Sequence, residues 1–270
     1  MIIPFTPSRP LWLLGCGNMA GAMLDRWLDT GLDPAAVTVI DPNRNDAPAG
    51  VRLLARAPDE APPAGLLLGV KPQMFASATP DAGRLADSGT TVISIMAGVD
   101  GATIGRRFAD AAIIRLMPNL PAALGKGVAI LHLARGGDDA RAIADALAGP
   151  LGLALWVENE ALIDAGTAVS GSGPAFVYRF IQAMAAGAER LGFAPGQAAA
   201  LALATVEGAA ALAARSDATP GELAERVASP GGTTRAGLNV LDADDALTRL
   251  VETTLQAAAD RASALATAAR

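Results

Sequence analysis

The segment Gly15-Cys-Gly-Asn-Met-Ala20 constrains the fold more than any other part of the chain. It fits the pattern G-x-G-x-x-A and stands between an apolar run at 11–14 and a stretch at 19–28 with helical spacing. The first glycine permits a tight turn, the second lets a pyrophosphate approach the backbone, and the alanine allows close helix packing. The helix N-terminus then offers N–H groups to phosphates. The pattern predicts a dinucleotide-binding strand–turn–helix unit, and a purely structural glycine turn is the alternative.

Short apolar runs alternate with helical stretches along the first part of the chain. The runs show no inside–outside alternation, which is typical of strands covered on both faces. We therefore expect an α/β fold of the Rossmann type, with a doubly wound parallel sheet. Its strands are expected at 11–14, 37–40, 66–70, 91–95, 113–116, 127–131 and 153–157.

The second part of the chain is alanine-rich and has no strand-like run. We predict a Rossmann domain over 10–158 and an all-α domain over 159–270. The many alanines either mark helices covered by another subunit or reflect codon usage, and both interpretations stay open. Helices are expected near 160–169, 174–191, 195–214, 219–227 and 243–269.

Composition excludes several classes of function. The net charge of -6 and the 4 % of aromatic residues argue against a nucleic-acid partner. One cysteine and one histidine are too few for a disulfide or a Cys/His zinc site, and we expect no metal. The longest uncharged run of the C-terminal half, 191–206, is too short for a membrane span, and we expect no signal peptide in residues 1–10. We therefore expect a cytoplasmic protein without a membrane partner.

Two positions next to the expected strands carry charges suited to a nucleotide. Asp41 ends the second strand, where a carboxylate would bind a ribose 2′-OH and favour NAD, whereas the nearby Arg44 would accept a 2′-phosphate and favour NADP. The two residues point to opposite choices, and a solvated turn is the alternative for both. Lys71 follows another strand at the carboxyl edge of the sheet, where a positive charge could face a cofactor.

Two further motifs are rich in glycine and hydroxyl groups. The segment 170–176 opens a helix, with Pro174 suited to its first turn. The segment 228–234 places two glycines and three hydroxyls between helices, where backbone N–H groups and hydroxyls could bind a carboxylate. An ordinary helix–helix connection is the alternative.

Taken in order, these motifs resemble those of the pyrroline-5-carboxylate reductase family over essentially the whole chain after residue 10. The match includes Leu14-Gly-Cys-Gly-Asn-Met19, Val70-Lys-Pro72, Ser94-Ile-Met-Ala-Gly98, Met117-Pro-Asn-Leu-Pro121, Ser170-Gly-Ser-Gly-Pro174 and Ser229-Pro-Gly-Gly-Thr-Thr234.

The resemblance implies reduction of 1-pyrroline-5-carboxylate to L-proline, with NADPH as the expected cofactor and NADH as a possible one. It implies a C-terminal domain that forms a homodimer, and some members of the family assemble further into decamers. The expected cofactor residues are Leu14, Gly15, Cys16, Gly17, Asn18, Met19, Asp41, Asn43, Arg44, Val70, Lys71, Pro72, Ile95, Met96, Ala97 and Asn119.

The resemblance also places the substrate on the hydroxyl-rich loop. Ser229, Gly232 and Thr233 are expected to bind its carboxylate, and Thr234, the expected catalytic residue, to approach its ring nitrogen. Leu120 and Met96 depart from the usual family residues, and Met96 could narrow the nicotinamide pocket.

Three rival functions have distinct marks. A β-hydroxyacid dehydrogenase would need a lysine in its helical domain, and this chain has none after Lys126. A reductase of other cyclic imines would have a larger pocket near Phe176 and Met96, and a non-catalytic protein would bind NADPH without turnover. Residues 1–9 have no evident role and are expected to be a disordered extension.

Overall fold

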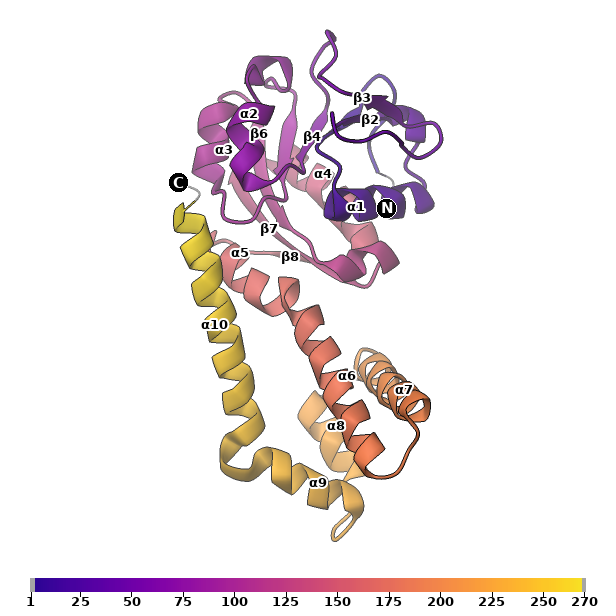
Figure 1. The fold of residues 1–270 in the computed structure, drawn as a ribbon. Helices are drawn as coiled ribbons and strands as arrows, with labels where there is room; N and C mark the ends of the chain where they lie inside the picture. The colour runs from indigo at the N-terminus through magenta and orange to yellow at the C-terminus, as the bar shows by residue number, and fades with distance from the viewer. Residues whose placement is uncertain (1–2, 269–270) are drawn as a thin grey trace. The chain divides into compact units, whose positions relative to one another are not determined.

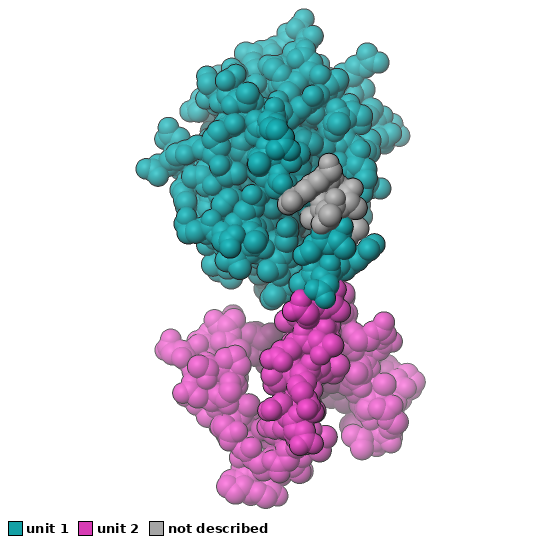
Figure 2. All heavy atoms as spheres, turned by 90° about the vertical axis from the view of Figure 1, so that its left-hand side faces the viewer, with its two compact units in different colours: residues 1–171, 258–270 teal, residues 172–257 magenta. Residues whose placement is uncertain are grey.

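The computed structural model describes residues 3–268, and for 265–268 it describes the backbone alone. The chain forms two compact units, coloured separately in Figure 2. The first contains the chain up to Gly171 together with the C-terminal segment from Ala258, and the second contains Ser172–Ala257. The first two residues of the N-terminal extension and the last two of the expected C-terminal domain lie outside the described residues.

The first unit is built on an eight-stranded sheet of order β3-β2-β1-β4-β5-β6-β7-β8 (Figure 1). The Rossmann-type fold expected from the sequence is confirmed, and each of the seven expected strands is present. All residues of β1, β2, β4 and β5 are buried, which explains their uninterrupted apolar runs. The strands are β1 Leu11–Leu14, β2 Val37–Ile40, β3 Arg52–Leu54, β4 Gly65–Leu68, β5 Thr91–Ser94, β6 Ala112–Met117, β7 Gly127–Arg135 and β8 Gly152–Trp156.

The sheet differs from the expected one in two respects. Strand β3 was not predicted; it pairs parallel to β2 at the edge of the sheet. Strand β7 runs antiparallel to β6, so the expectation of a wholly parallel sheet was wrong here. The connection between them is a 3₁₀ turn, Leu120–Leu124, that ends at Gly125 with a φ of 65°. It is too short for the crossover that a parallel neighbour requires.

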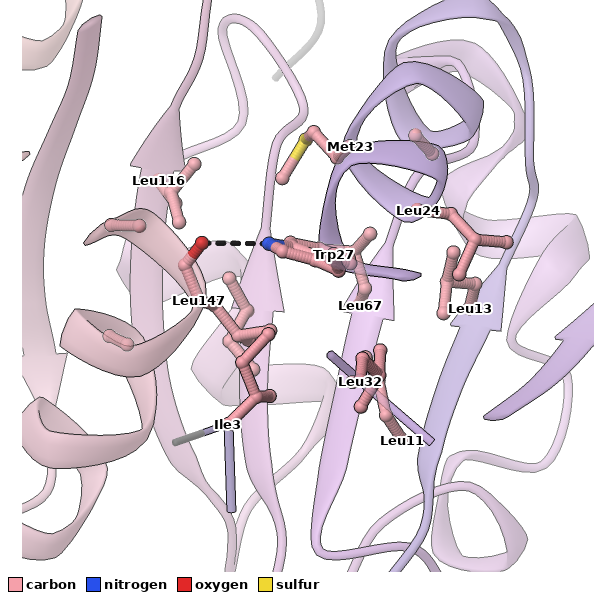
Figure 3. Packing of buried hydrophobic residues seen from close by; sticks show 14 of the residues in the cluster. Ile3, Leu11, Leu13, Met23, Leu24, Trp27, Leu32, Leu67, Leu116 and Leu147 are labelled. Atoms are coloured by element: carbon pink, nitrogen blue, oxygen red, sulfur yellow. Dashed lines mark hydrogen bonds between the residues drawn. The ribbon is translucent and has the colours of Figure 1, made fainter. Parts of the chain in front are cut away.

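Helices cover both faces of this sheet. Residues of α1 (Asn18–Asp29) and α4 (Asp138–Ala148) pack in one apolar cluster, and residues of α2 (Phe75–Ala78) and α3 (Gly101–Arg107) pack in the cluster on the other face. The buried Trp27 indole Nε1 donates to the Leu147 carbonyl at 2.8 Å, which joins α1 to α4 (Figure 3). This contact orients α1, the helix that begins at the glycine motif.

The N-terminal segment belongs to the core, so the expectation of a disordered extension was wrong for its described residues. Ile3 and Phe5 are 8 % and 4 % exposed and pack in the same cluster as Trp27. The Phe5 ring fills the space above Gly65, where a Cβ would lie only 2.7 Å from it. The two apolar side chains therefore seal the amino-terminal edge of the sheet.

The second unit is helical throughout its regular structure. Its helices are α6 Gly173–Arg190, α7 Pro195–Ala213, α8 Pro220–Val227, α9 Thr233–Asp242 and the first half of α10 Ala246–Ala268; α9 was not predicted, and the short α5 (Ala161–Gly166) belongs to the first unit. Within the described chain, no residue of α6 is buried, and α7 buries only Ala198 and Ala202. Large apolar side chains are therefore exposed along these helices, including Tyr178, Phe180 and Leu203.

Helix α7 has the length and the composition of a membrane span. Its mean hydropathy is 1.3, and 11 % of it is buried. One such helix is weak evidence by itself, because alanine-rich helices that pack against other helices have the same composition.

The packing of Phe5 predicts the effect of replacing its side chain with a smaller one. Phe5→Ala should lower the free energy of unfolding by about 3 kcal/mol, because it leaves a cavity in a buried cluster. Ser8→Ala, at an exposed position of the same segment, should change it by less than about 0.5 kcal/mol. Urea unfolding followed by circular dichroism measures both, and equal midpoints for the two variants would contradict the packing described here.

Candidate functional site

A cavity of about 800 Å³ lies along the carboxyl ends of the strands around β1. In this strand order, β2 and β3 lie on one side of β1, and β4 and the later strands lie on the other. Doubly wound folds bind ligands at the point where the strand order reverses in this way. The predicted residues that line the cavity are Leu14, Gly15, Gly17, Asp41, Asn43, Val70 and Lys71. The structure thus brings together three segments that are far apart in sequence.

The glycines of the motif have different structural roles. Gly15 has a φ of 82°, and a Cβ there would lie 2.7 Å from Val70 Cγ1, so the fold itself requires glycine. Gly17 has an ordinary φ of -74°, and a Cβ there would meet no protein atom within 4 Å. The space next to Gly17 is therefore open for a ligand. Because α1 has no side-chain cap at Gly17, its N-terminus also faces this space without competition.

Asp41 braces the glycine motif. One carboxylate oxygen, Oδ2, accepts from Cys16 N at 2.9 Å, and the other, Oδ1, accepts from Asn43 N at 2.9 Å. The carboxylate therefore ties the loop after β2 to the loop after β1. Each oxygen has one backbone donor and can still accept a second hydrogen bond.

Arg44 lies against the same loop. Its Nη1 donates to the Cys16 carbonyl at 3.0 Å and to Cys16 Sγ at 2.8 Å, and its Nε donates to the Asp46 carbonyl at 2.8 Å. Burial raises the pKa of the Cys16 thiol, and the neighbouring Arg44 charge only partly offsets this. Cys16 is therefore a protonated packing residue at neutral pH.

Further predicted cofactor residues follow β4 and β5. Lys71 is exposed at the start of a 3₁₀ turn, Pro72–Met74, and Val70 packs against Gly15. Ile95, Met96 and Ala97 follow β5, but the Met96 side chain is 2 % exposed and packs in the core. The structure therefore places Met96 in the core and not in the lining of the cavity.

Asn119 connects β6 to the end of the first unit. Its Nδ2 donates to the Ser170 carbonyl at 2.9 Å, and its Oδ1 accepts from Val128 N at 2.8 Å. Nearby, Arg115 is 2 % exposed and pairs with Glu160 and Asp164 at 3.2 and 3.3 Å. These contacts hold α5 and the π-helical turn Thr167–Gly171 against the sheet.

The predicted substrate residues form the turn before α9 in the second unit. Gly232 N donates to the Ser229 carbonyl at 3.0 Å, and Gly231 has a φ of 70°. With Pro230 before it, this is the signature of a type II turn. The turn leads into α9, which begins at Thr233 and has no side-chain cap. Ser229, Thr233 and Thr234 are exposed there, next to an uncapped helix N-terminus.

Sequence reasoning missed one side of the cavity. The segment 55–57, which follows the unpredicted β3, lines it together with residues between Met74 and Leu85. A weak signal was present, since Val51, Leu53 and Leu54 are apolar and only Arg52 interrupts them. Within residues 3–268, no group of three or more His, Cys, Asp or Glu side chains is placed to hold a metal ion.

Comparison with known families agrees with the two-part organisation. A family model described as pyrroline-5-carboxylate reductase dimerisation matches residues 160–265. A second model, described as NADP oxidoreductase coenzyme F420-dependent, matches residues 11–98, which contain the glycine motif.

Whole-length relatives are found among curated proteins and solved structures. The chain is 34 % identical to a pyrroline-5-carboxylate reductase of Pseudomonas aeruginosa (94 % of this chain, 95 % of that protein) and 38 % identical to one of Synechocystis (87 % and 90 %). A pyrroline-5-carboxylate reductase structure from Coxiella burnetii has a TM-score of 0.88 at 29 % identity (95 % and 98 %). A pyrroline carboxylate reductase from Plasmodium falciparum with NADP bound has the same fold, with a TM-score of 0.83 at 22 % identity (98 % and 100 %).

The two glycines predict opposite effects of the same substitution. Gly17→Ala should leave the free energy of unfolding nearly unchanged and weaken NADPH binding by at least about 10-fold, since its methyl group occupies the space of a phosphate contact. Gly15→Ala should destabilise the fold by at least about 1 kcal/mol, because the backbone there disfavours a side chain. Thermal unfolding and quenching of tryptophan fluorescence by NADPH separate the two effects. Undiminished NADPH binding by Gly17→Ala would contradict the assignment of this loop.

Proposed function

Because the chain belongs to the pyrroline-5-carboxylate reductase family, we propose that it reduces 1-pyrroline-5-carboxylate to L-proline with NAD(P)H. The observation that carries this function is similarity over nearly the whole length of reductases that are 34–38 % identical. When bound, the nicotinamide supplies a hydride to the carbon of the C=N bond, C2 of 1-pyrroline-5-carboxylate, which becomes C5 of proline. The ring nitrogen keeps its proton, and the product is a secondary amine. Orientation of a protonated imine matters more here than a strong acid.

The cofactor site of the proposal is the loop set at the carboxyl edge of the sheet. The residues present fit a dinucleotide, since Gly17 leaves open space and the N-terminus of α1 is uncapped. Lys71 would contribute positive charge, and Asn119 would support the nicotinamide end. The residues proposed to bind are Leu14–Met19, Asp41, Asn43, Arg44, Val70–Pro72, Ile95–Ala97 and Asn119.

The substrate site of the proposal is the turn before α9. The uncapped N–H group of Thr233, next to Gly232 and the Ser229 hydroxyl, suits a carboxylate, because a helix N-terminus favours a negative charge. Anchoring the carboxylate would determine which carbon of the ring faces the hydride. The Thr234 hydroxyl would hold the ring nitrogen by a hydrogen bond, which makes it the proposed catalytic residue.

The proposal divides the chain into a dinucleotide domain, 10–158, and a dimerisation and substrate-binding domain, 159–270. The match of residues 160–265 to a dimerisation family supports a homodimer, as do the exposed apolar side chains of α6 and α7. The proposal extends to assembly of such dimers into a decamer. In a homodimer the partner subunit would cover the apolar faces of these helices, so they would not need a membrane. We therefore propose that the enzyme is cytoplasmic.

The proposed reaction can be tested with a simple assay. Purified protein should oxidise NADPH in the presence of 1-pyrroline-5-carboxylate and release L-proline, with initial rates measured by absorbance for NADPH and NADH in parallel. Cofactor binding without turnover would contradict the proposed function. Faster turnover of another cyclic imine would show that this imine, and not 1-pyrroline-5-carboxylate, is the substrate.

The role of Thr234 predicts a kinetic defect without a loss of stability. Thr234→Ala should lower kcat/KM for 1-pyrroline-5-carboxylate by about 10-fold or more, on the scale of a lost positioning hydrogen bond. Thr253→Ala, an exposed threonine on α10, is the matched control and should keep the wild-type value. Equal kinetics for the two variants would remove Thr234 from the mechanism.

A further inference from the structure

The cavity contains an arginine that the proposal above leaves without a role. Arg56 follows β3 by two residues and lines the cavity together with Asp41, Pro42 and Asn43. Its side chain is exposed, and among the side chains that the structure describes none forms a hydrogen bond or ion pair with its guanidinium. A free guanidinium inside a ligand cavity is available for an anion.

The register of the sheet places Arg56 next to the loop after β2. Strand β3 pairs with β2, and Ile40 is opposite Leu54. The backbone N–H of Asp41 donates to the Leu54 carbonyl at 2.9 Å, so the pairing continues past the end of β2. The loops after the two strands therefore run side by side, and in this fold the end of β2 is where the 2′ position of the adenosine ribose is read.

The other cations near the cavity have different positions or partners. Arg44 donates to the carbonyls of Cys16 and Asp46. Arg84 lines the cavity but is paired with Asp59 at 2.5 Å. Lys71 follows β4, which is separated from β2 by β1, at roughly 10 Å for two strand spacings. Among the described residues, Arg56 is thus the cation of the cavity lining that lies on the ribose side and has no hydrogen-bond or ion-pair partner.

The negative charge of Asp41 explains why a cation is useful at this position. Each oxygen of its carboxylate accepts one backbone N–H group, so Asp41 holds the loop after β2 against the glycine loop. Its negative charge nevertheless stays beside the ribose position and would repel a phosphate. A second positive charge, in addition to that of Arg44, would offset this repulsion, and a planar guanidinium matches phosphate oxygens in geometry as well as in charge.

Resting on the proposed function, we propose that Arg56 binds the 2′-phosphate of NADPH and that this contact makes the enzyme prefer NADPH to NADH. The cofactor specificity of the chain then depends on the loop after β3, with Asp41 and Arg44 acting as braces of the glycine loop.

Two nucleotides that differ only in the 2′-phosphate test the contact directly. Calorimetry with adenosine 2′,5′-bisphosphate and with adenosine 5′-monophosphate should show that the wild type binds the bisphosphate at least about 10-fold more tightly, as expected for charge-assisted hydrogen bonds. Arg56→Gln should lose most of this difference while its affinity for the monophosphate changes by less than about twofold. Arg56→Lys should keep part of it, because the charge remains.

Arg52→Gln is the matched control. Arg52 is an exposed arginine on the same strand, pairs with Glu60 at 2.9 Å and lies outside the residues that line the cavity. Its substitution should leave the wild-type preference for the bisphosphate intact. Thermal unfolding of each variant checks that the fold is unchanged.

Steady-state kinetics provide the second readout. Arg56→Gln should raise the KM for NADPH by about 10-fold or more and change the KM for NADH far less. A wild type that binds both nucleotides equally, an Arg56→Gln variant with unchanged preference, or an equal loss for both nucleotides would overturn the assignment. A protein that discriminates the nucleotides through Arg56 but does not reduce 1-pyrroline-5-carboxylate would contradict the proposed function alone.

Discussion

The cavity depends on how closely the turn after β1 approaches the end of β4. Gly15 lies against Val70, and a Cβ on Gly69 would be 2.5 Å from the Gly15 carbonyl, so neither position has room for a side chain. Backbone bonds from Gly15 N to Ile40 O and from Gly69 N to Leu14 O join β1 to both neighbours at this point. The Asp41 brace to Cys16 N then holds the loop in place. These contacts position the N-terminus of α1 over the space that a phosphate requires.

Much of the fold could be predicted because burial on both faces leaves a plain signal in the sequence. The runs at β1, β2, β4 and β5 are fully buried and were all found. Strand β3 has only half-buried leucines next to an exposed arginine, so its signal is weak. The direction of β7 depends on the length of a connection, which residue patterns do not report, and α9 was hidden because it starts inside a loop motif.

The parts of the candidate site that carry sequence motifs could be predicted. The glycine loop and the segment after β4 line the cavity as expected, but no pattern could decide between Asp41 and Arg44. That choice depends on where the side chains turn, and in the structure both are engaged with Cys16. Arg56 reaches the site through the pairing of β3 with β2, a relation that only the sheet reveals. The turn before α9 is proposed as the substrate loop from its resemblance to a family, and a turn before an uncapped helix fits that role.

The transfer of a hydride to the imine carbon is the central claim, and isotopic labelling tests it most directly. Nicotinamide cofactor deuterated at C4 on the transferred face, incubated with the enzyme and 1-pyrroline-5-carboxylate, should give L-proline with a single deuterium at C5, as read by mass spectrometry and NMR. Proline without deuterium at C5, or deuterium retained in the cofactor while the substrate stays unreduced, would contradict the account.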